Sequence, residues 1–181
     1  MDFHLPEAER AELATQYRFD QEKDAAEPCG QGCVYMFGSR YASGGAGCVS
    51  TVEDFIKFLE ALRFDGKLLK KETIEMMSKD WLNEEQRAAC RYSTNSIGYG
   101  LGVRAPRAGA DRTEFGWGGA AGAFASVDPV NNMSIYYAQH VLSSPNNSLR
   151  TWLYHTVRAD LLGEKVHIPN VELNYDSSIT Y

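Results

Sequence analysis

The chain has 181 residues, 44% of them hydrophobic and 23% charged, which are proportions of a globular protein rather than of a disordered, collagen-like or coiled-coil chain. Its length suits one domain or at most two small ones, and no apolar run reaches the ~18 residues that a membrane-spanning helix needs, so no membrane span is expected. The net charge is −6, and the first 28 residues carry −5 of it, so no basic stripe is available to bind nucleic acid or an anionic membrane surface.

The first 50 residues are predicted to contain little regular structure. Residues from Glu7 to Tyr17 fit a short helix, those from Tyr17 to Phe19 fit a short strand, and residues 20–32 are polar and glycine-bearing, as in a loop. The small residues 43–47 predict another loop. The chain starts with polar and acidic residues that show no signal peptide, so its compartment is not predicted.

Two helices are predicted between residues 50 and 82. The stretch from Ser50 to Glu53 fits a capping box, in which a hydroxyl at the N-cap is followed three residues later by a carboxylate. Apolar residues then recur at helical spacing, and Asp65-Gly66 ends this first helix. The second helix is expected from Lys71 to Leu82, with its methionines as core filling.

Alternation with a period of two replaces the helical pattern after residue 95. It predicts strands from Tyr99 to Val103, from Ala121 to Val127 and from Met133 to His140. Turn-forming residues at 128–132 separate the last two strands, which we therefore expect to form an antiparallel hairpin.

A final helix is predicted from Ser148 to Leu162, ended by Gly163. Together the elements predict an α+β fold, in which an antiparallel β-sheet has the C-terminal helix packed on it and is accompanied by the helical segment of residues 50–82. Residues 1–163 would form this domain and residues 164–181 a tail. Helical spacing predicts the buried face of the last helix: Leu149, Trp152, Leu153, Thr156, Val157 and Leu161.

Motifs for metal binding are weak in this chain. Cys29 and Cys33 are separated by three residues instead of the two of common redox and zinc motifs, and we interpret them, like Cys48 and Cys90, as small buried or loop thiols. No metal and no cofactor are predicted, and a cysteine-based metal site stays open only as a minor alternative.

Nucleophile motifs are missing as well. No Ser is followed three residues later by Lys, and neither Gly-x-Ser-x-Gly nor Tyr-x-Asn occurs; the loose Ser-x-Asn matches at Ser93 and Ser144 are expected by chance. His140 falls at a strand end with no neighbouring carboxylate, and His155 falls beside the buried face of the last helix. The sequence therefore predicts no catalytic triad.

The glycine-rich stretch Phe115-Gly116-Trp117-Gly118-Gly119-Ala120 stands immediately before a predicted strand. Consecutive glycines let a ligand approach a strand edge closely and leave backbone N–H groups directed at it. We predict an extended backbone over residues 118–120, with the N–H of Ala120 free rather than paired inside the sheet.

Four segments, taken in order, resemble serine β-lactamase-related proteins, and within them the branch of class C-like β-lactamases, esterases and penicillin-binding-protein-like members. The segments are Gly38 to Asp54, Tyr99 to Val103, Gly116 to Ala120 and Val127-Asp128-Pro129. Each is short, but their order and spacing agree with that branch over roughly residues 38–140. The resemblance implies a β-lactamase/transpeptidase-like fold and hydrolysis of a small ester, amide or β-lactam-like substrate through an acyl-enzyme.

The same resemblance implies that this chain matches only the C-terminal part of such a protein. Family members carry Ser-x-x-Lys, which supplies the nucleophile and its base, and then Tyr-x-Asn, and both would precede residue 1. A missing N-terminal portion is thus the implied partner, and alone the chain would be inactive.

The site residues implied by the resemblance lie mainly in the glycine-rich stretch. The backbone N–H of Ala120 would be one of two oxyanion donors. The family's Lys/His-Thr/Ser-Gly triplet corresponds here to Trp117-Gly118-Gly119, so its cationic side chain is missing. The remaining implied contacts with substrate are Trp117, Gly118 and Gly119, with Tyr41, Ser43 and Gly44 at the rim.

Two functions from different classes stay open. The first is the oxyanion-strand half of a serine hydrolase, and the second is a stand-alone, non-catalytic binding or structural module of the same fold. If a partner portion is missing, the apolar area that it would cover is exposed, which predicts self-association into homo-oligomers. The sequence does not predict the substrate.

Overall fold

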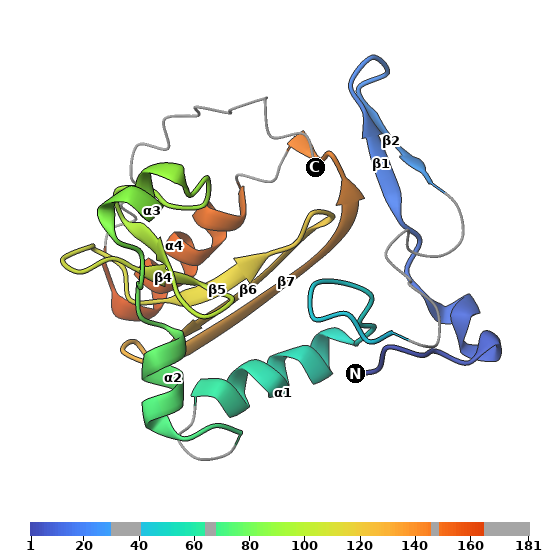
Figure 1. Cartoon of the computed structure of the whole chain (residues 1–181). Helices are drawn as coiled ribbons and strands as arrows, with labels where there is room; N and C mark the ends of the chain where they lie inside the picture. The colour runs from blue at the N-terminus through green and yellow to red at the C-terminus, as the bar shows by residue number, and fades with distance from the viewer. Residues whose placement is uncertain (30–40, 64–67, 146–148, 165–181) are drawn as a thin grey trace. The chain divides into compact units, whose positions relative to one another are not determined.

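Seven strands form the sheet, in the order β2-β1-β7-β6-β5-β4-β3 (Figure 1). The structure is a computed structural model that describes residues 1–29, 41–63, 68–145 and 149–164. Helices accompany the sheet, so the α+β class expected from the sequence is confirmed. The chain divides into two units, the first made of Met1–Phe55, Gly119–Ala123 and Tyr137–Tyr181 and the second of Ile56–Gly118 and Phe124–Tyr136.

The N-terminal segment of the first unit holds more structure than predicted. The expected strand is present as β1 (Tyr17–Asp20), but the expected loop contains β2 (Ala25–Pro28), which pairs antiparallel with β1. The Asp20 carboxylate accepts the N–H groups of the turn between them, at 2.9 and 3.2 Å, and so closes the hairpin. On its other side β1 runs parallel to β7 (Met133–Leu142), so the sheet is mixed at this point. The predicted first helix is only a short 3-10 helix, Glu7–Glu12.

The predicted helices of residues 50–82 are present with different ends. Helix α1 (Val52–Arg63) is capped by Thr51, whose hydroxyl accepts the N–H of Asp54 at 3.1 Å, one residue later than the predicted Ser50 cap. Helix α2 (Lys71–Met77) ends five residues before the predicted end, at the C-cap Ser78, whose N–H and hydroxyl both donate to the Ile74 carbonyl.

A further helix, α3 (Glu84–Ala89), was not expected. Its signal is in the sequence: the Asn83 side chain accepts the Gln86 N–H at 2.8 Å, and the Gln86 side chain accepts the Asn83 N–H at 3.0 Å. This reciprocal capping box starts a helix of only six residues, too short to show helical periodicity.

The predicted strand from Tyr99 to Val103 is wrong. The chain instead makes a hairpin of β3 (Ile97–Tyr99) and β4 (Arg104–Pro106), in which Tyr99 lies opposite Arg104. The Gly100 N–H donates to the Val103 carbonyl at 2.8 Å, and Gly102 has a φ of +77°. The alternating glycines therefore make a turn, because only glycine adopts that φ without strain.

Strands β5 (Phe115–Gly118) and β6 (Gly122–Asp128) pair antiparallel in the second unit, with Phe115 opposite Val127. The turn from β6 to β7 confirms the prediction for residues 128–132. It is held by the buried Asp128 carboxylate, which accepts the Thr113 hydroxyl at 2.8 Å and the Asn131 side-chain amide at 2.7 Å. The buried apolar residues of this unit include Ala105, Phe115, Val127, Met133 and Ile135.

The last helix is present as α4 (Leu149–Leu162), and Gly163 ends it with a φ of +66°. The Glu164 N–H donates to the Ala159 carbonyl at 2.9 Å, as expected of a glycine C-cap. The predicted buried face is wrong in part: Leu161 is 64% exposed and Thr156 is also exposed, whereas Tyr154, His155 and Ala159 are buried. Spacing alone could not place this face, since it depends on what the helix packs against.

Candidate functional site

An aromatic cluster surrounds Trp117 in the second unit. Its indole ring lies 5.0 Å from the ring of Tyr92 and 5.6 Å from that of Tyr99, both edge-on. Such edge-to-face pairs hold large rings in fixed orientations. The predicted substrate-contacting tryptophan is therefore part of a rigid aromatic wall built by β3, β5 and the segment before β3.

The cluster also contains a positive charge that the sequence did not reveal. The guanidinium carbon of Arg104 lies 5.2 Å from the centre of the Trp117 ring and 5.8 Å from that of Tyr92. Arg104 is on β4, opposite Gly116 of β5. The triplet Trp117-Gly118-Gly119 lacks a cation of its own, but the neighbouring strand supplies one to its first residue.

Gly116 lets β5 approach β6 closely. A Cβ at this position would stand 2.0 Å from the carbonyl oxygen of Ala125, a backbone atom that cannot turn aside. The glycine before Trp117 is thus required by strand packing rather than by a ligand.

The predicted oxyanion residue lies in the first unit, in a tight turn. The Gly119 N–H donates to the Ala123 carbonyl at 2.7 Å, and the Gly122 N–H donates to the Gly119 carbonyl at 3.1 Å. Extended backbone was expected over residues 118–120, but it ends with Gly118, and Ala120 is a turn residue. Within the described part of the chain, the Ala120 N–H donates no hydrogen bond.

Two side chains from other elements of the first unit support this turn. Arg150 of α4 donates through Nη1 to the carbonyls of Gly119 and Ala123, at 3.0 and 3.1 Å. Gln139 of β7 fills the space beside Gly122, where a Cβ would stand 2.5 Å from its Oε1. Gly122 also has a φ of +100°, so a side chain there would be strained as well as crowded.

Tyr41 and Ser43 belong to the first unit, whereas Trp117 and Gly118 belong to the second. Tyr41 is 64% exposed, and the Ser43 hydroxyl accepts the Gly45 N–H at 3.2 Å. Gly44 has open space around it. Their place at the rim of a substrate cleft stays a prediction.

The serines and histidines that the sequence singled out are used structurally. The Ser93 hydroxyl donates to the Ile97 carbonyl at 3.2 Å, and Ser144 is bonded to Gln139 at 2.9 Å. His140 contacts the side-chain amide nitrogen of Gln16 through Nε2 at 2.8 Å and the Ala14 carbonyl through Nδ1 at 3.2 Å. These two contacts occupy both ring nitrogens of His140.

The cysteines Cys29, Cys48 and Cys90 are free thiols, and Cys33 lies outside the described residues. The Cys29 thiol donates a hydrogen bond to the Gln16 carbonyl, with Sγ 3.3 Å from the oxygen. In the described part of the chain, no group of three His, Cys, Asp or Glu side chains could hold a metal ion. No helix there is long and apolar enough to cross a membrane.

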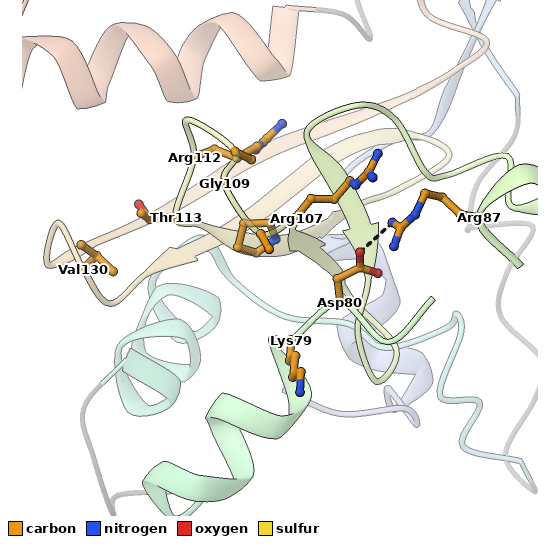
Figure 2. Close-up of a pocket in the computed structure, with 11 residues that line it drawn as sticks. Lys79, Asp80, Arg87, Arg107, Gly109, Arg112, Thr113 and Val130 are labelled. Atoms are coloured by element: carbon orange, nitrogen blue, oxygen red, sulfur yellow. Dashed lines mark hydrogen bonds and ion pairs between the residues drawn. The ribbon is translucent and has the colours of Figure 1, made fainter. Parts of the chain in front are cut away.

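A cavity of about 600 Å³ in the second unit is lined by four cationic side chains and one acid (Figure 2). Each cation is already engaged: Arg87 with Asp80 at 2.7 Å, Arg112 with Glu114, Arg107 with the Thr94 carbonyl, and Lys79 over the Trp81 ring. Figure 2 shows the ends of Lys79 and Arg112 directed to opposite sides. The cavity is therefore no ready-made anion site.

Asp80 anchors the wall of this cavity. Its carboxylate accepts Arg87 Nη1 at 2.7 Å and the N–H groups of Leu82 and Tyr99 at 3.2 and 3.1 Å. Burial alone would raise the pKa of Asp80, but these hydrogen bonds and the charge of Arg87 outweigh it and lower the pKa below its usual value. Asp80 is thus a structural carboxylate that joins the α2–α3 segment to β3.

The family model described as Beta-lactamase matches residues 1–160. The chain belongs to the β-lactamase family. No match was found among curated proteins.

Solved structures agree with this β-lactamase-family assignment at the level of the fold. A LovD6 mutant of simvastatin synthase (LovD) from Aspergillus terreus is 17% identical, with a TM-score of 0.71, over 87% of this chain and 45% of that one. Unliganded simvastatin synthase from the same fungus is 19% identical, with a TM-score of 0.63, over 83% of this chain and 42% of that one. The chain thus spans less than half the length of these neighbours.

The sequence pattern of this β-lactamase-family chain indicated the glycine-rich stretch. It did not indicate the two arginines that contact this stretch. Arg104 contacts it through strand pairing, and Arg150, which lies 31 residues after Gly119, contacts it from helix α4. Neither arginine stands in a motif, so no local signal marks them.

Proposed function

We propose that this chain forms the oxyanion-strand half of a β-lactamase-related serine hydrolase that acts on small ester, amide or β-lactam-like substrates. The nucleophile and its base, which the Ser-x-x-Lys motif supplies in the family, and the Tyr-x-Asn motif would come from a portion outside these 181 residues. Substrate acylates the nucleophile serine, the leaving group departs, and water then releases the acid and regenerates the serine.

The observation that carries this proposal is the turn at Gly119–Gly122. Its own two hydrogen bonds use the N–H groups of Gly119 and Gly122, and the Ala120 N–H between them has no acceptor among the described residues. An unused N–H held by a tight turn is the kind of group that binds a developing oxyanion without having to reorganise. Ala120 would be one of two such donors, and the nucleophile's own N–H the other.

Trp117, Gly118 and Gly119 would line the acyl pocket, with Tyr41 and Ser43 at its rim. The rings of Tyr92 and Tyr99 support this role for Trp117, because they hold the indole in place from two sides. Arg104 adds a cation to the same wall, so substrates that carry a carboxylate belong in the set to be tested.

The acceptor of the acyl group has two candidates. Water gives hydrolysis, and an alcohol gives a new ester. The structural neighbours are named synthases, so we include an alcohol acceptor in the proposal. Product analysis with and without added alcohol separates the two.

The experiment is a complementation assay. Purified 1–181 is incubated with a chromogenic short-chain ester and a chromogenic cephalosporin, alone and after adding the separately expressed upstream portion of its gene. We expect no turnover above buffer from the chain alone, because it lacks an activated nucleophile. Activity that appears only with both portions supports the half-enzyme. Activity of the chain alone that disappears on mutating one of its serines contradicts it, and binding without turnover in either form favours a non-catalytic module.

A further inference from the structure

We infer that Arg150 is a positioning residue that fixes the direction and the donor strength of the Ala120 N–H, an inference that rests on the proposed function. Arg150 Nη1 lies 3.0 Å from the carbonyl oxygen of Gly119. That carbonyl and the Ala120 N–H are the two ends of one peptide unit. A bond to the carbonyl therefore acts directly on the proposed oxyanion donor.

The direction follows from peptide geometry. The described chain contains no cis peptide bond, and a trans peptide is planar, with its C=O and N–H on opposite sides. The Gly119 carbonyl is held by two donors, Arg150 Nη1 at 3.0 Å and the Gly122 N–H at 3.1 Å. Because these two donors fix the carbonyl, the Ala120 N–H must point away from the Arg150 guanidinium.

The donor strength follows from polarisation. Hydrogen bonds from a charged donor are roughly twice as strong as neutral ones, and bonds in a chain strengthen one another by roughly 10–30% each. The guanidinium draws electron density toward the carbonyl oxygen, which leaves the N–H of the same peptide more positive. Ala120 then binds a developing negative charge better than an ordinary backbone N–H does.

The position of Arg150 in its own helix supports a role outside that helix. Arg150 is the second residue of α4, and no acidic residue is present in the first turn. A cation in the first turn opposes the helix dipole, so Arg150 does not serve to stabilise α4 itself. Its second bond, to the Ala123 carbonyl at 3.1 Å, holds the other end of the same turn.

The test compares backbone NMR spectra of the 181-residue chain as wild type, Arg150→Met, Arg150→Lys and Arg158→Met. Arg158 is the matched control, because it lies on the same helix and pairs with Glu164 at 3.4 Å. We expect Arg150→Met to shift the Ala120 amide proton upfield and to move the Gly119 carbonyl carbon. Arg150→Lys should recover at least half of both changes, and Arg158→Met should leave both signals in place.

An unchanged Ala120 amide in a folded Arg150→Met variant overturns the inference, as does an Arg150→Lys spectrum in which neither signal differs from that of the methionine variant. If the methionine variant does not fold, Arg150→Gln replaces it as the uncharged variant: an Ala120 amide proton that shifts upfield in Arg150→Gln and returns in Arg150→Lys supports the inference, and an unchanged Ala120 amide in a folded Arg150→Gln variant overturns it.

Kinetic measurements distinguish a failure of this inference from a failure of the proposed function on which it rests. In the complemented enzyme, weakening the donor rather than removing it should lower kcat about tenfold, less than the ~10²–10³ lost with a whole oxyanion donor, with KM little changed. The NMR result needs no catalysis. If no form of the enzyme is active, the proposed function is contradicted and the NMR result is unaffected. If the Arg150→Met enzyme is active with the kcat of the wild type, only the inference about Arg150 is contradicted.

Discussion

The guanidinium of Arg104 lies 5.2 Å from the centre of the Trp117 indole ring, and Arg104 and Trp117 belong to the adjacent strands β4 and β5. Cation–π pairs contribute about 0.5–1 kcal/mol at exposed sites and about 2 when desolvated. The contact thus couples the strand that ends at Gly118 to its neighbour.

The first prediction is that a double-mutant cycle with Arg104→Gln and Trp117→Leu gives a coupling energy of about 0.5–1 kcal/mol in urea unfolding. The cycle removes each side of the contact separately and then both together. Additive effects of the two substitutions would show that the ring and the cation do not stabilise each other.

The second prediction concerns the close contact of Gly98 with Asp80. A Cβ on Gly98 would stand 2.0 Å from the Asp80 carboxyl carbon, while three hydrogen bonds hold that carboxylate in place. Gly98→Ala should therefore lower the free energy of unfolding by about 1–3 kcal/mol, the range for overpacking a well-packed site. Gly44→Ala is the control, because nothing lies within 4 Å of its Cβ position. Equal stability of the two variants would contradict the packing.

The third prediction follows from the lowered pKa of Asp80. A carboxyl whose pKa is lower in the folded than in the unfolded state stabilises the fold above its unfolded pKa, and loses that contribution as the pH falls through the folded pKa. The pH range in which Asp80 loses its stabilising contribution therefore lies below 3.8, the usual pKa of an aspartate. Asp80→Asn should be less stable than wild type at about pH 6, and the difference should shrink as the pH falls below 3.8. If the difference in stability between wild type and Asp80→Asn stays constant across this pH range, the effect comes from the shape of the side chain and not from its charge.

These outcomes show where sequence patterns are informative. Helices α1 and α4 and strands β6 and β7 follow from apolar spacing, because long elements average over many residues. The strand expected at Tyr99–Val103 failed because glycines at alternate positions imitate the strand period while favouring a turn.

The sequence predicts only those residues of the candidate site that lie together in one short stretch of the chain. Trp117 and Ala120 stand in a recognisable stretch, so the sequence located them. Arg104 and Arg150 reach that stretch through strand pairing and through helix packing, and neither is encoded by residues nearby in the chain. The buried face of α4 failed for the same reason, since a helix with apolar residues on several sides takes its face from what it packs against.

The fourth prediction is that the chain self-associates. Leu161 and Leu162 at the end of α4 are 64% and 40% exposed, and exposed apolar side chains that adjoin one another favour association. Light scattering should show a mass that rises with concentration, and Leu161→Glu should reduce it. A monomer of constant mass over the whole range, in both proteins, would contradict an uncovered interface.

The measurement that bears most directly on the central claim is kcat for Ala120→Pro and Ala120→Gly in the complemented enzyme. Ala120 is the second residue of the turn and has a negative φ, so proline fits there and removes only the N–H. Glycine keeps the N–H and serves as the control. If this N–H stabilises the oxyanion, Ala120→Pro should lower kcat by about 10²–10³ with KM little changed, and Ala120→Gly should stay within about threefold of wild type. A folded Ala120→Pro enzyme that turns over at the wild-type rate would contradict the assignment.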